Sequence, residues 1–387
     1  MPLRLGSLGR EIEEMASREV TLERRQRVER AREALRRLDP REVRTRLGDP
    51  RTVTTFVAAL PLGAFAAAFP APEAPRDFSV AAADGSSMGP DRHFPVRYYV
   101  LNTGYAVITY GSRPGAILDS RSRLYFRDEE VYLALQHRTL PVEGAILSAK
   151  MAVEELATLF EVASQAPRPV VALTDGVIIL WGLQNVPEEV QGEFLGPFLE
   201  TLGRFAQEGI PVANYISLPG AHDVVNALRV GLCPEAVVNC ARCEFEAGRK
   251  DSACASLAGV PDRELFIYLR EGERSDLFQS RAPILEKYKE HQVGFFYLNA
   301  GQEIARVEAP LWVLEDPRTL DLVHAAVVDQ CRRGRGYPPA LQEAHEQAAI
   351  TTADRRVVEE MIEEAFARRR VVLPWSAKER SKRERGI

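Results

Sequence analysis

The chain has 387 residues, of which 45% are hydrophobic, and a formal net charge of −5. This length and composition suit one large domain or two ordinary ones with a substantial core. The net charge excludes a uniformly basic nucleic-acid-binding protein, although a local basic patch is compatible with it. The apolar stretch from Phe56 to Phe69 is too short for a membrane span, and the charged N-terminus lacks the apolar core of a signal peptide. We therefore expect a cytoplasmic protein.

The N-terminal region, residues 1–50, is rich in Glu and Arg with scattered apolar residues. This pattern predicts one or two exposed helices that end at Leu38-Asp39-Pro40. Such helices are either a solvated surface or an element that contacts a partner. The basic segment at the other end, residues 376–387, is expected to be a short tail.

The first β region begins with the apolar run Phe78–Ala83, which is typical of a strand buried on both faces. It runs into Asp84-Gly85-Ser86, a sequence that favours a turn. A hairpin is predicted around Asn102-Thr103-Gly104, between strands at 96–100 and 105–110. Segments 123–126 and 131–135 are expected to continue the sheet.

The next part of the chain mixes helices and strands. Apolar residues at helical spacing predict a helix over 145–165, and a second buried strand over 170–174 runs into Asp175-Gly176. The later elements are expected as strands at 177–181, 211–218, 293–298 and 303–308, and as helices at 190–208, 319–333, 339–350 and 353–369. This order predicts an α/β fold with a mixed sheet flanked by helices.

An aspartate follows a buried strand twice, at Asp84 and at Asp175. Each Asp-Gly alone is typical of an ordinary turn. Two such carboxylates could also converge on a divalent metal ion, which prefers hard oxygen ligands. A metal supports phosphodiester cleavage because it activates water and neutralises charge on the phosphate.

Two further elements could complete a site of this kind. The helix over 145–165 offers Glu154 and Glu155, and Glu155 lies nearer the expected buried face. Downstream, His345 follows Leu341 by four residues, on the same helical stripe. Beside two carboxylates, His345 could be a metal ligand or a proton shuttle. A surface acid and an ordinary helix histidine are the alternatives.

Several short motifs, taken in order, resemble the NurA family of DNA end-processing nucleases over about residues 75–370. They are Asp84-Gly85-Ser86, Thr174-Asp175-Gly176 with Leu180-Trp181, Phe295-Phe296-Tyr297-Leu298, Ala305-Arg306-Val307-Glu308, and Gly336-Tyr337-Pro338 with Ala344-His345. The resemblance implies an RNase H-like core, a homodimer, and cleavage of DNA from 5′ ends that depends on Mn²⁺, with Mg²⁺ as the alternative. It also implies a HerA-type hexameric ATPase as partner in double-strand break repair.

The resemblance also assigns roles to residues. Asp84 and Asp175 match metal-binding aspartates, His345 matches the histidine of the late helix, and either Glu154 or Glu155 matches the helix acid. The strand with Arg306 and Glu308 is matched too, with either a core or a substrate-positioning role. Basic residues that could contact phosphate are Arg306, Lys287, Lys289, Arg355 and Arg356, with an ordinary surface role as the alternative.

Four cysteines cluster within a polar, loop-like insertion at about residues 232–259. They are Cys233, Cys240, Cys243 and Cys254, whereas Cys331 is isolated. A cytosolic chain seldom keeps structural disulfides, so the spacing favours zinc or an iron–sulfur cluster. Reduced thiols and redox-active disulfides remain the alternatives. The resemblance does not require this loop.

Two functions compete with a nuclease. A non-catalytic adaptor could keep the fold and bind DNA or a translocase, but it would not need Asp84, Asp175 and His345. A metal-dependent hydrolase of small molecules ranks last, because the sequence contains no Walker motif and no GxGxxG.

Overall fold

The computed structural model describes residues 5–19, 22–90, 94–136, 138–175, 178–243 and 252–373. The predicted tail at 376–387 lies outside them. The chain forms two compact units, which are described separately. Unit 1 comprises 1–71, 216–282 and 294–307, and unit 2 comprises 72–215, 283–293 and 308–387. Within the described ranges no helix is both long and apolar enough to cross a membrane.

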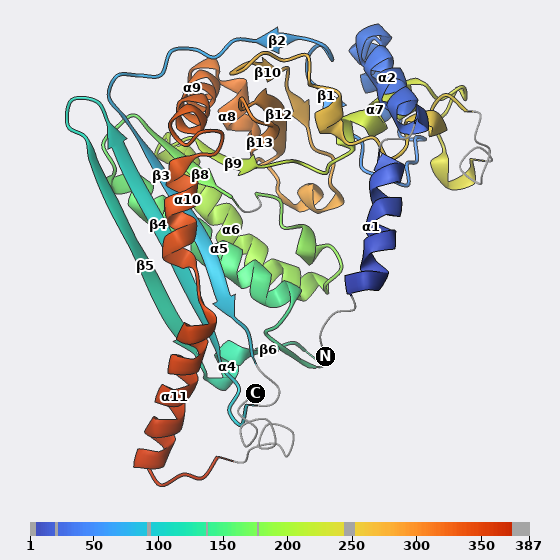
Figure 1. The fold of residues 1–387 in the computed structure, drawn as a ribbon. Helices are drawn as coiled ribbons and strands as arrows, with labels where there is room; N and C mark the ends of the chain where they lie inside the picture. The colour runs from blue at the N-terminus through green and yellow to red at the C-terminus, as the bar shows by residue number, and fades with distance from the viewer. Residues whose placement is uncertain are drawn as a thin grey trace. The chain divides into compact units, whose positions relative to one another are not determined.

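The main feature of unit 2 is a mixed sheet (Figure 1). Its strands are β3 (Phe78–Met88), β4 (Tyr99–Tyr110), β5 (Gly115–Tyr125), β8 (Val170–Thr174) and β9 (Val212–Ile216). They lie in the order β9-β8-β3-β4-β5, with β8 parallel to β3 and β9, and β4 antiparallel to β3 and β5. Numbered along the chain, this order is 5-4-1-2-3, the RNase H-like arrangement that the sequence led us to expect.

Helices flank this sheet. They are α5 (Ala145–Gln165), α6 (Glu188–Gln207), α8 (Leu311–Glu315), α9 (Pro317–Arg333), α10 (Pro339–Ala348) and α11 (Thr352–Arg368). A short helix, α4 (Asp128–Val131), precedes a separate hairpin of β6 (Tyr132–Ala134) and β7 (Thr139–Pro141). The apolar face of α5 packs on β3. The residues that α5 buries include Leu156, Leu159 and Phe160, which lie on that face of the helix.

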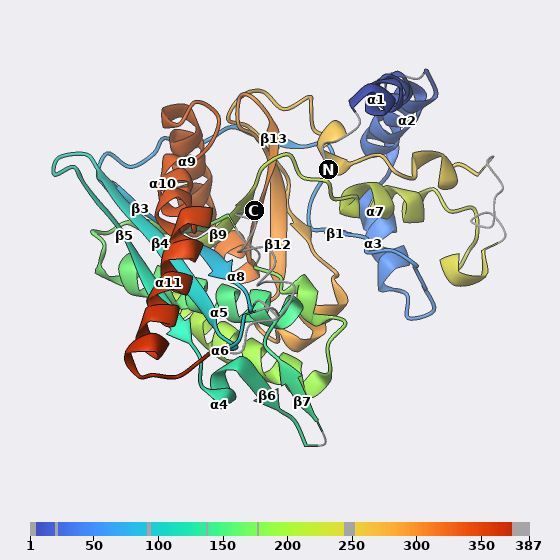
Figure 2. The same cartoon turned by 60° about the horizontal axis from the view of Figure 1, so that its bottom comes forward.

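Two glycines show that α5 and α10 cover opposite faces of the sheet. A side chain at Gly85 would meet Met151 of α5, whereas one at Gly104 would meet the backbone of Ala348 in α10. Gly104 is the register partner of Asp84, the residue before Gly85. Because side chains alternate between the faces of a strand, the two helices lie on different sides. Figures 1 and 2 show α10 crossing the sheet on the side away from α5 and α6.

Four predictions about local structure in unit 2 were wrong. The strand that carries Asp84 does not turn there but continues to Met88. The segment around Asn102 is no hairpin but the middle of β4, and its side-chain amide donates to the carbonyls of Gln347 and Ala348 at the end of α10. The predicted strand at 177–181 is absent among its described residues, which form bends and a 3-10 turn. In addition, residues 131–135 pair with β7 rather than continuing the main sheet.

Unit 1 has its own apolar core beneath short strands and helices. The helices are α1 (Leu5–Glu19), α2 (Leu22–Arg37), α3 (Pro40–Gly48) and α7 (Asp223–Gly231). The strands are β1 (Leu60–Pro61), β2 (Ala68–Phe69), β10 (Arg274–Ser275), β11 (Phe278–Gln279), β12 (Val293–Asn299) and β13 (Ile304–Pro310). The N-terminal region thus has three helices, and α2 is not a fully exposed one, because Val28, Ala31 and Leu35 are buried in this core.

Candidate active site

Asp84 and Asp175 lie on neighbouring parallel strands of unit 2. Ala83 of β3 pairs in register with Thr174 of β8, so the next residue on each strand is an aspartate. A parallel pair keeps such residues at the same level of the sheet, which brings the two carboxylates to one place. One is in mid-strand and the other directly follows its strand.

His345 reaches the same place from α10. Its Nδ1 lies 2.6 Å from Oδ2 of Asp84, a hydrogen bond that the carboxylate accepts. The approach depends on Gly104, because a Cβ there would stand 2.2 Å from the backbone nitrogen of Ala348. The Asp84 side chain is 18% exposed and the His345 ring is 70% exposed, so the pair opens to solvent on the histidine side.

Of the two helix acids, Glu155 is the one beside the aspartates. It is buried, and its Oε2 lies 3.4 Å from the position that a Cβ on Gly85 would occupy. The missing side chain at Gly85 therefore leaves room for this carboxylate against β3. Burial raises the pKa of Glu155 to about 8, and the charges of Asp84 and Asp175 add to the rise.

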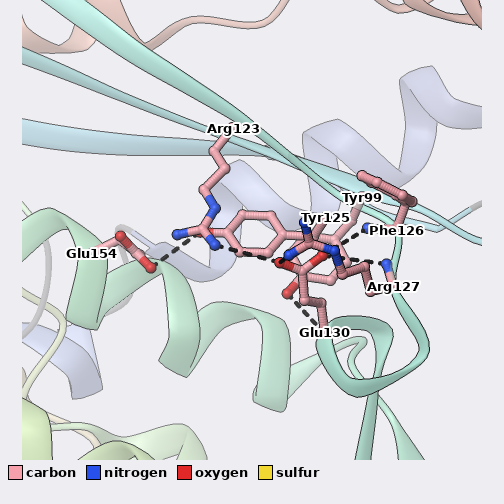
Figure 3. Close-up of polar contacts among 7 residues, drawn as sticks. All are labelled: Tyr99, Arg123, Tyr125, Phe126, Arg127, Glu130 and Glu154. Carbon is pink, nitrogen blue, oxygen red and sulfur yellow. Dashed lines mark hydrogen bonds and ion pairs between the residues drawn. The ribbon is translucent and has the colours of Figure 1, made fainter.

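Glu154 lies among residues of the sheet edge rather than beside the aspartates (Figure 3). Its Oε1 accepts a hydrogen bond of 3.1 Å from the hydroxyl of Tyr125 at the end of β5. Tyr125 stacks on Tyr99 with ring centroids 4.6 Å apart, and the Arg123 guanidinium lies over the Tyr125 ring. This contact joins α5 to the sheet, and none of it involves Asp84 or Asp175.

Sequence reasoning did not place Tyr337 in the site. Its hydroxyl donates to Oδ2 of Asp175 at 2.7 Å, and its ring packs edge-on against Tyr215 of β9, with centroids 5.6 Å apart. The tyrosine stands in the loop before α10, inside the Gly336-Tyr337-Pro338 motif. The motif is the only sequence signal that indicates Tyr337. Hydrophobic periodicity could not identify it, because loop residues show no such periodicity.

The other predicted contact residues fall elsewhere. Arg306 is 2% exposed and donates to Asp223 at 2.8 Å, so of the two roles considered for it the core role fits its surroundings. Glu308 is buried as well. Lys287 pairs with Glu188 at 2.6 Å on the surface of unit 2. Lys289 and Arg356 are exposed and Arg355 is half-buried.

The donors at this place suit a hard divalent cation. Three carboxylates and an imidazole are ligands that Mn²⁺ and Mg²⁺ accept. Burial is the main cause of the raised Glu155 pKa, and a cation would neutralise the charges of Asp84 and Asp175 that add to the rise. Within the described part of the chain no three Asp, Glu, His or Cys side chains stand close enough to hold a metal as they are. Carboxylates repel one another without a cation, and here Asp84 and Asp175 turn an oxygen to His345 and Tyr337 instead.

The sequence and the fold resemble those of known proteins. The family model for the NurA domain matches residues 78–350, more than half of the chain. A search of curated proteins found no match. The crystal structure of the NurA nuclease from Sulfolobus solfataricus is similar at 13% identity with a TM-score of 0.53, covering 97% of this chain and 100% of that one. At this identity the likeness shows the fold alone.

Two weaker structural matches were found. A crystal structure of NurA with manganese has 13% identity and a TM-score of 0.34, and covers 76% of this chain and 91% of that one. The crystal structure of LC9-RNase H1, a type 1 RNase H with the type 2 active-site motif, has 15% identity and a TM-score of 0.22. The match covers 39% of this chain and 69% of that one.

Proposed function

The chain belongs to the NurA domain family, and we propose that it is a Mn²⁺-dependent DNA nuclease that cleaves from 5′ ends and also cuts single strands internally. The observation that supports the proposal is that Asp84 and Asp175 lie at the same level of neighbouring parallel strands, with His345 bonded to Asp84 and the buried Glu155 near enough for both aspartate charges to raise its pKa. An adaptor would gain nothing from a buried carboxylate held beside two others, because that arrangement weakens the fold.

In this proposal Asp84, Asp175 and Glu155 hold the cation, with His345 as a further ligand or a proton carrier. Mn²⁺ supplies a positive charge that stabilises the phosphate and makes water a better nucleophile. Tyr337 orients the Asp175 carboxylate through its hydroxyl. The exposed His345 ring, held by its bond to Asp84, is placed to pass a proton to the leaving oxygen.

The test compares two neighbouring acids on one helix. Glu155→Gln removes a charge from the site, whereas Glu154→Gln removes one from the contact with Tyr125. Cleavage of labelled single- and double-stranded DNA is measured with Mn²⁺, with Mg²⁺ and with EDTA. We expect Mn²⁺-dependent cleavage that Glu155→Gln lowers on the order of 10²–10³-fold, while Glu154→Gln stays near wild type.

DNA binding is measured in parallel by fluorescence anisotropy with Ca²⁺ in place of Mn²⁺. Binding that Glu155→Gln retains would place the loss in the chemical step. Binding without cleavage in the wild-type protein would contradict the nuclease and leave the adaptor. Equal loss in both variants would show that the helix, not the carboxylate, was disturbed.

We further propose that the protein works as a homodimer with a HerA-type hexameric ATPase in end resection. The family resemblance is the support for both. Light scattering of the purified protein gives its mass in solution, and co-purification with a hexameric ATPase from the same organism tests the partner. A monomer that does not associate with that ATPase, and whose cleavage the ATPase does not stimulate, would contradict this part.

A further inference from the structure

Four cysteines of unit 1 line one cavity that the proposed nuclease activity does not use. Cys233 follows α7, Cys240 and Cys243 begin and end a short 3-10 turn, and Cys254 begins another. All four line the same cavity of about 310 Å³. None of the four is joined in a disulfide, and only Cys233 among them is buried.

Hydrogen bonds fix the backbone at each cysteine. The Cys233 carbonyl accepts from Arg46 at 2.7 Å, the Cys240 amide donates to Val53 at 2.8 Å, and the Cys254 carbonyl accepts from Arg229 at 3.3 Å. The turn itself closes through the Cys243 amide, which donates to the Cys240 carbonyl. Backbone hydrogen bonds therefore set the positions of the four cysteines, and Cys233 and Cys240 also pack in the apolar core of unit 1.

The charge around the cavity suits an anionic centre. A metal ion bound by four thiolates carries a net negative charge, and the cavity wall contains two arginines, Arg229 and Arg242, against one acid, Glu235. The Arg46 guanidinium lies beside Cys233 through its bond to the carbonyl. A cluster of neutral thiols would need no such cations.

We propose that Cys233, Cys240, Cys243 and Cys254 bind one structural zinc ion. One C-x-x-C turn and two single cysteines are a ligand set that tetrahedral zinc accepts. No three of the described thiols are yet close enough to hold an ion. Binding therefore requires Cys240, Cys243 and Cys254, which stand on short, partly exposed turns, to close toward Cys233. The ion would tie the two 3-10 turns to the end of α7, and so stabilise unit 1.

The first experiment measures metal content. The full-length protein is purified without an affinity tag under reducing conditions, and zinc and iron are determined by mass spectrometry. We expect one zinc per chain, which Cys240→Ser/Cys243→Ser loses and Cys331→Ala keeps. Cys331 is a suitable control because it is a buried cysteine on α9 of unit 2 and does not line the cavity. Wild-type protein without metal, or with iron and acid-labile sulfide, would overturn the zinc assignment.

A second measurement does not depend on a folded variant. Wild-type protein is stripped of metal, reloaded with Co²⁺ or left empty, and then alkylated under native conditions and mapped. We expect the absorption bands of tetrahedral cobalt thiolate and protection of all four cysteines only in the loaded protein. Disulfides among these cysteines in the reduced preparation, or equal alkylation with and without metal, would contradict the proposal. Neither readout depends on DNA cleavage. The zinc proposal is therefore tested independently of the proposed nuclease function.

Discussion

At the scale of single residues, Glu155 has the pKa that is most strongly shifted in the candidate site. Burial raises its pKa to about 8, with the charges of Asp84 and Asp175 adding to the rise, against 4.5 for an ordinary glutamate. Between these two values the folded, metal-free protein holds a proton that the unfolded chain has released. The contribution of Glu155 to the free energy of unfolding is therefore present in full below the pKa of the unfolded chain, 4.5. It is lost as the pH rises through the pKa of the folded protein, about 8.

We predict that the free energy of unfolding of metal-free protein falls between about pH 5 and about pH 8, by up to ~1.4 kcal/mol per pH unit from this one group. Denaturant unfolding in EDTA across this range measures it, and Glu155→Gln should flatten the profile. Added Mn²⁺ should stabilise the protein more at the upper end, because binding there displaces less proton. A profile with the same slope in Glu155→Gln would assign the effect to other groups.

Tyr337 permits a test that leaves the packing intact. Tyr337→Phe removes only the hydroxyl that donates to Asp175 and keeps the ring contact with Tyr215. Loss of an outer partner of a metal ligand lowers metal affinity by roughly 10- to 100-fold. We therefore expect this variant to need more Mn²⁺ for half-maximal cleavage while its activity at saturating Mn²⁺ stays within about tenfold of wild type.

A titration of activity against Mn²⁺ measures both quantities. Tyr215→Phe is the control, since it removes a hydroxyl from the same pair of rings, one that donates to the Gly336 carbonyl at 3.4 Å. An unchanged Mn²⁺ requirement in Tyr337→Phe would mean that the hydroxyl does not orient Asp175 in the working enzyme.

At the scale of elements, the docking of α10 on β4 sets the position of His345. Gly104 allows it, since a Cβ there would lie 2.2 Å from the Ala348 nitrogen and 2.4 Å from the Ala344 carbonyl oxygen. Backbone atoms cannot rotate away as a side chain does, so the helix must shift. Gly104→Ala should destabilise unit 2 by about 1–3 kcal/mol and lower cleavage by moving His345 from Asp84.

Thermal unfolding and DNA cleavage measured on the same samples test this docking. Gly115→Ala is the matched control, because that glycine lies on β5 with nothing within 4 Å of the added atom. If Gly104→Ala were as stable and as active as Gly115→Ala, α10 would not be held at this distance in solution.

The same contacts explain which elements the sequence could predict. The helix at 145–165 and the strand at 170–174 were found with their bounds, because a continuous apolar pattern specifies them. Asp84-Gly85 and Asn102-Thr103-Gly104 were taken as turns from residues that usually make turns. In the fold these glycines instead make room for α5 and α10, and the asparagine amide binds the end of α10. Local sequence cannot distinguish a turn from a strand on which a distant helix docks.

At the scale of the whole molecule, the two units hold their charges differently. Unit 2 holds the buried Glu155 near the aspartates of the candidate site, whereas unit 1 buries a network of hydrogen-bonded charges. There Arg306 donates to Asp223 and lies over the Phe295 ring, 3.5 Å from its centroid. Asp262 accepts from the amides of Val224 and Val225 at the start of α7 and from the Tyr297 hydroxyl. Burial raises the pKa of Asp262, and the neighbouring Asp223 adds to the rise.

This network supports a prediction about where the protein unfolds. Arg306→Met removes the cation and leaves Asp223 buried beside Asp262, a change that costs about 3–5 kcal/mol when a buried pair is broken. Lys287→Met is the control, since it breaks an exposed pair in unit 2 that contributes at most about 1 kcal/mol. Hydrogen exchange should show lost protection in α7, β12 and β13 of Arg306→Met, and none in Lys287→Met. Because each unit has its own core, we expect α5 and β3 to keep their protection in both variants. Uniform loss through unit 2 in Arg306→Met would instead show that the two units unfold as one.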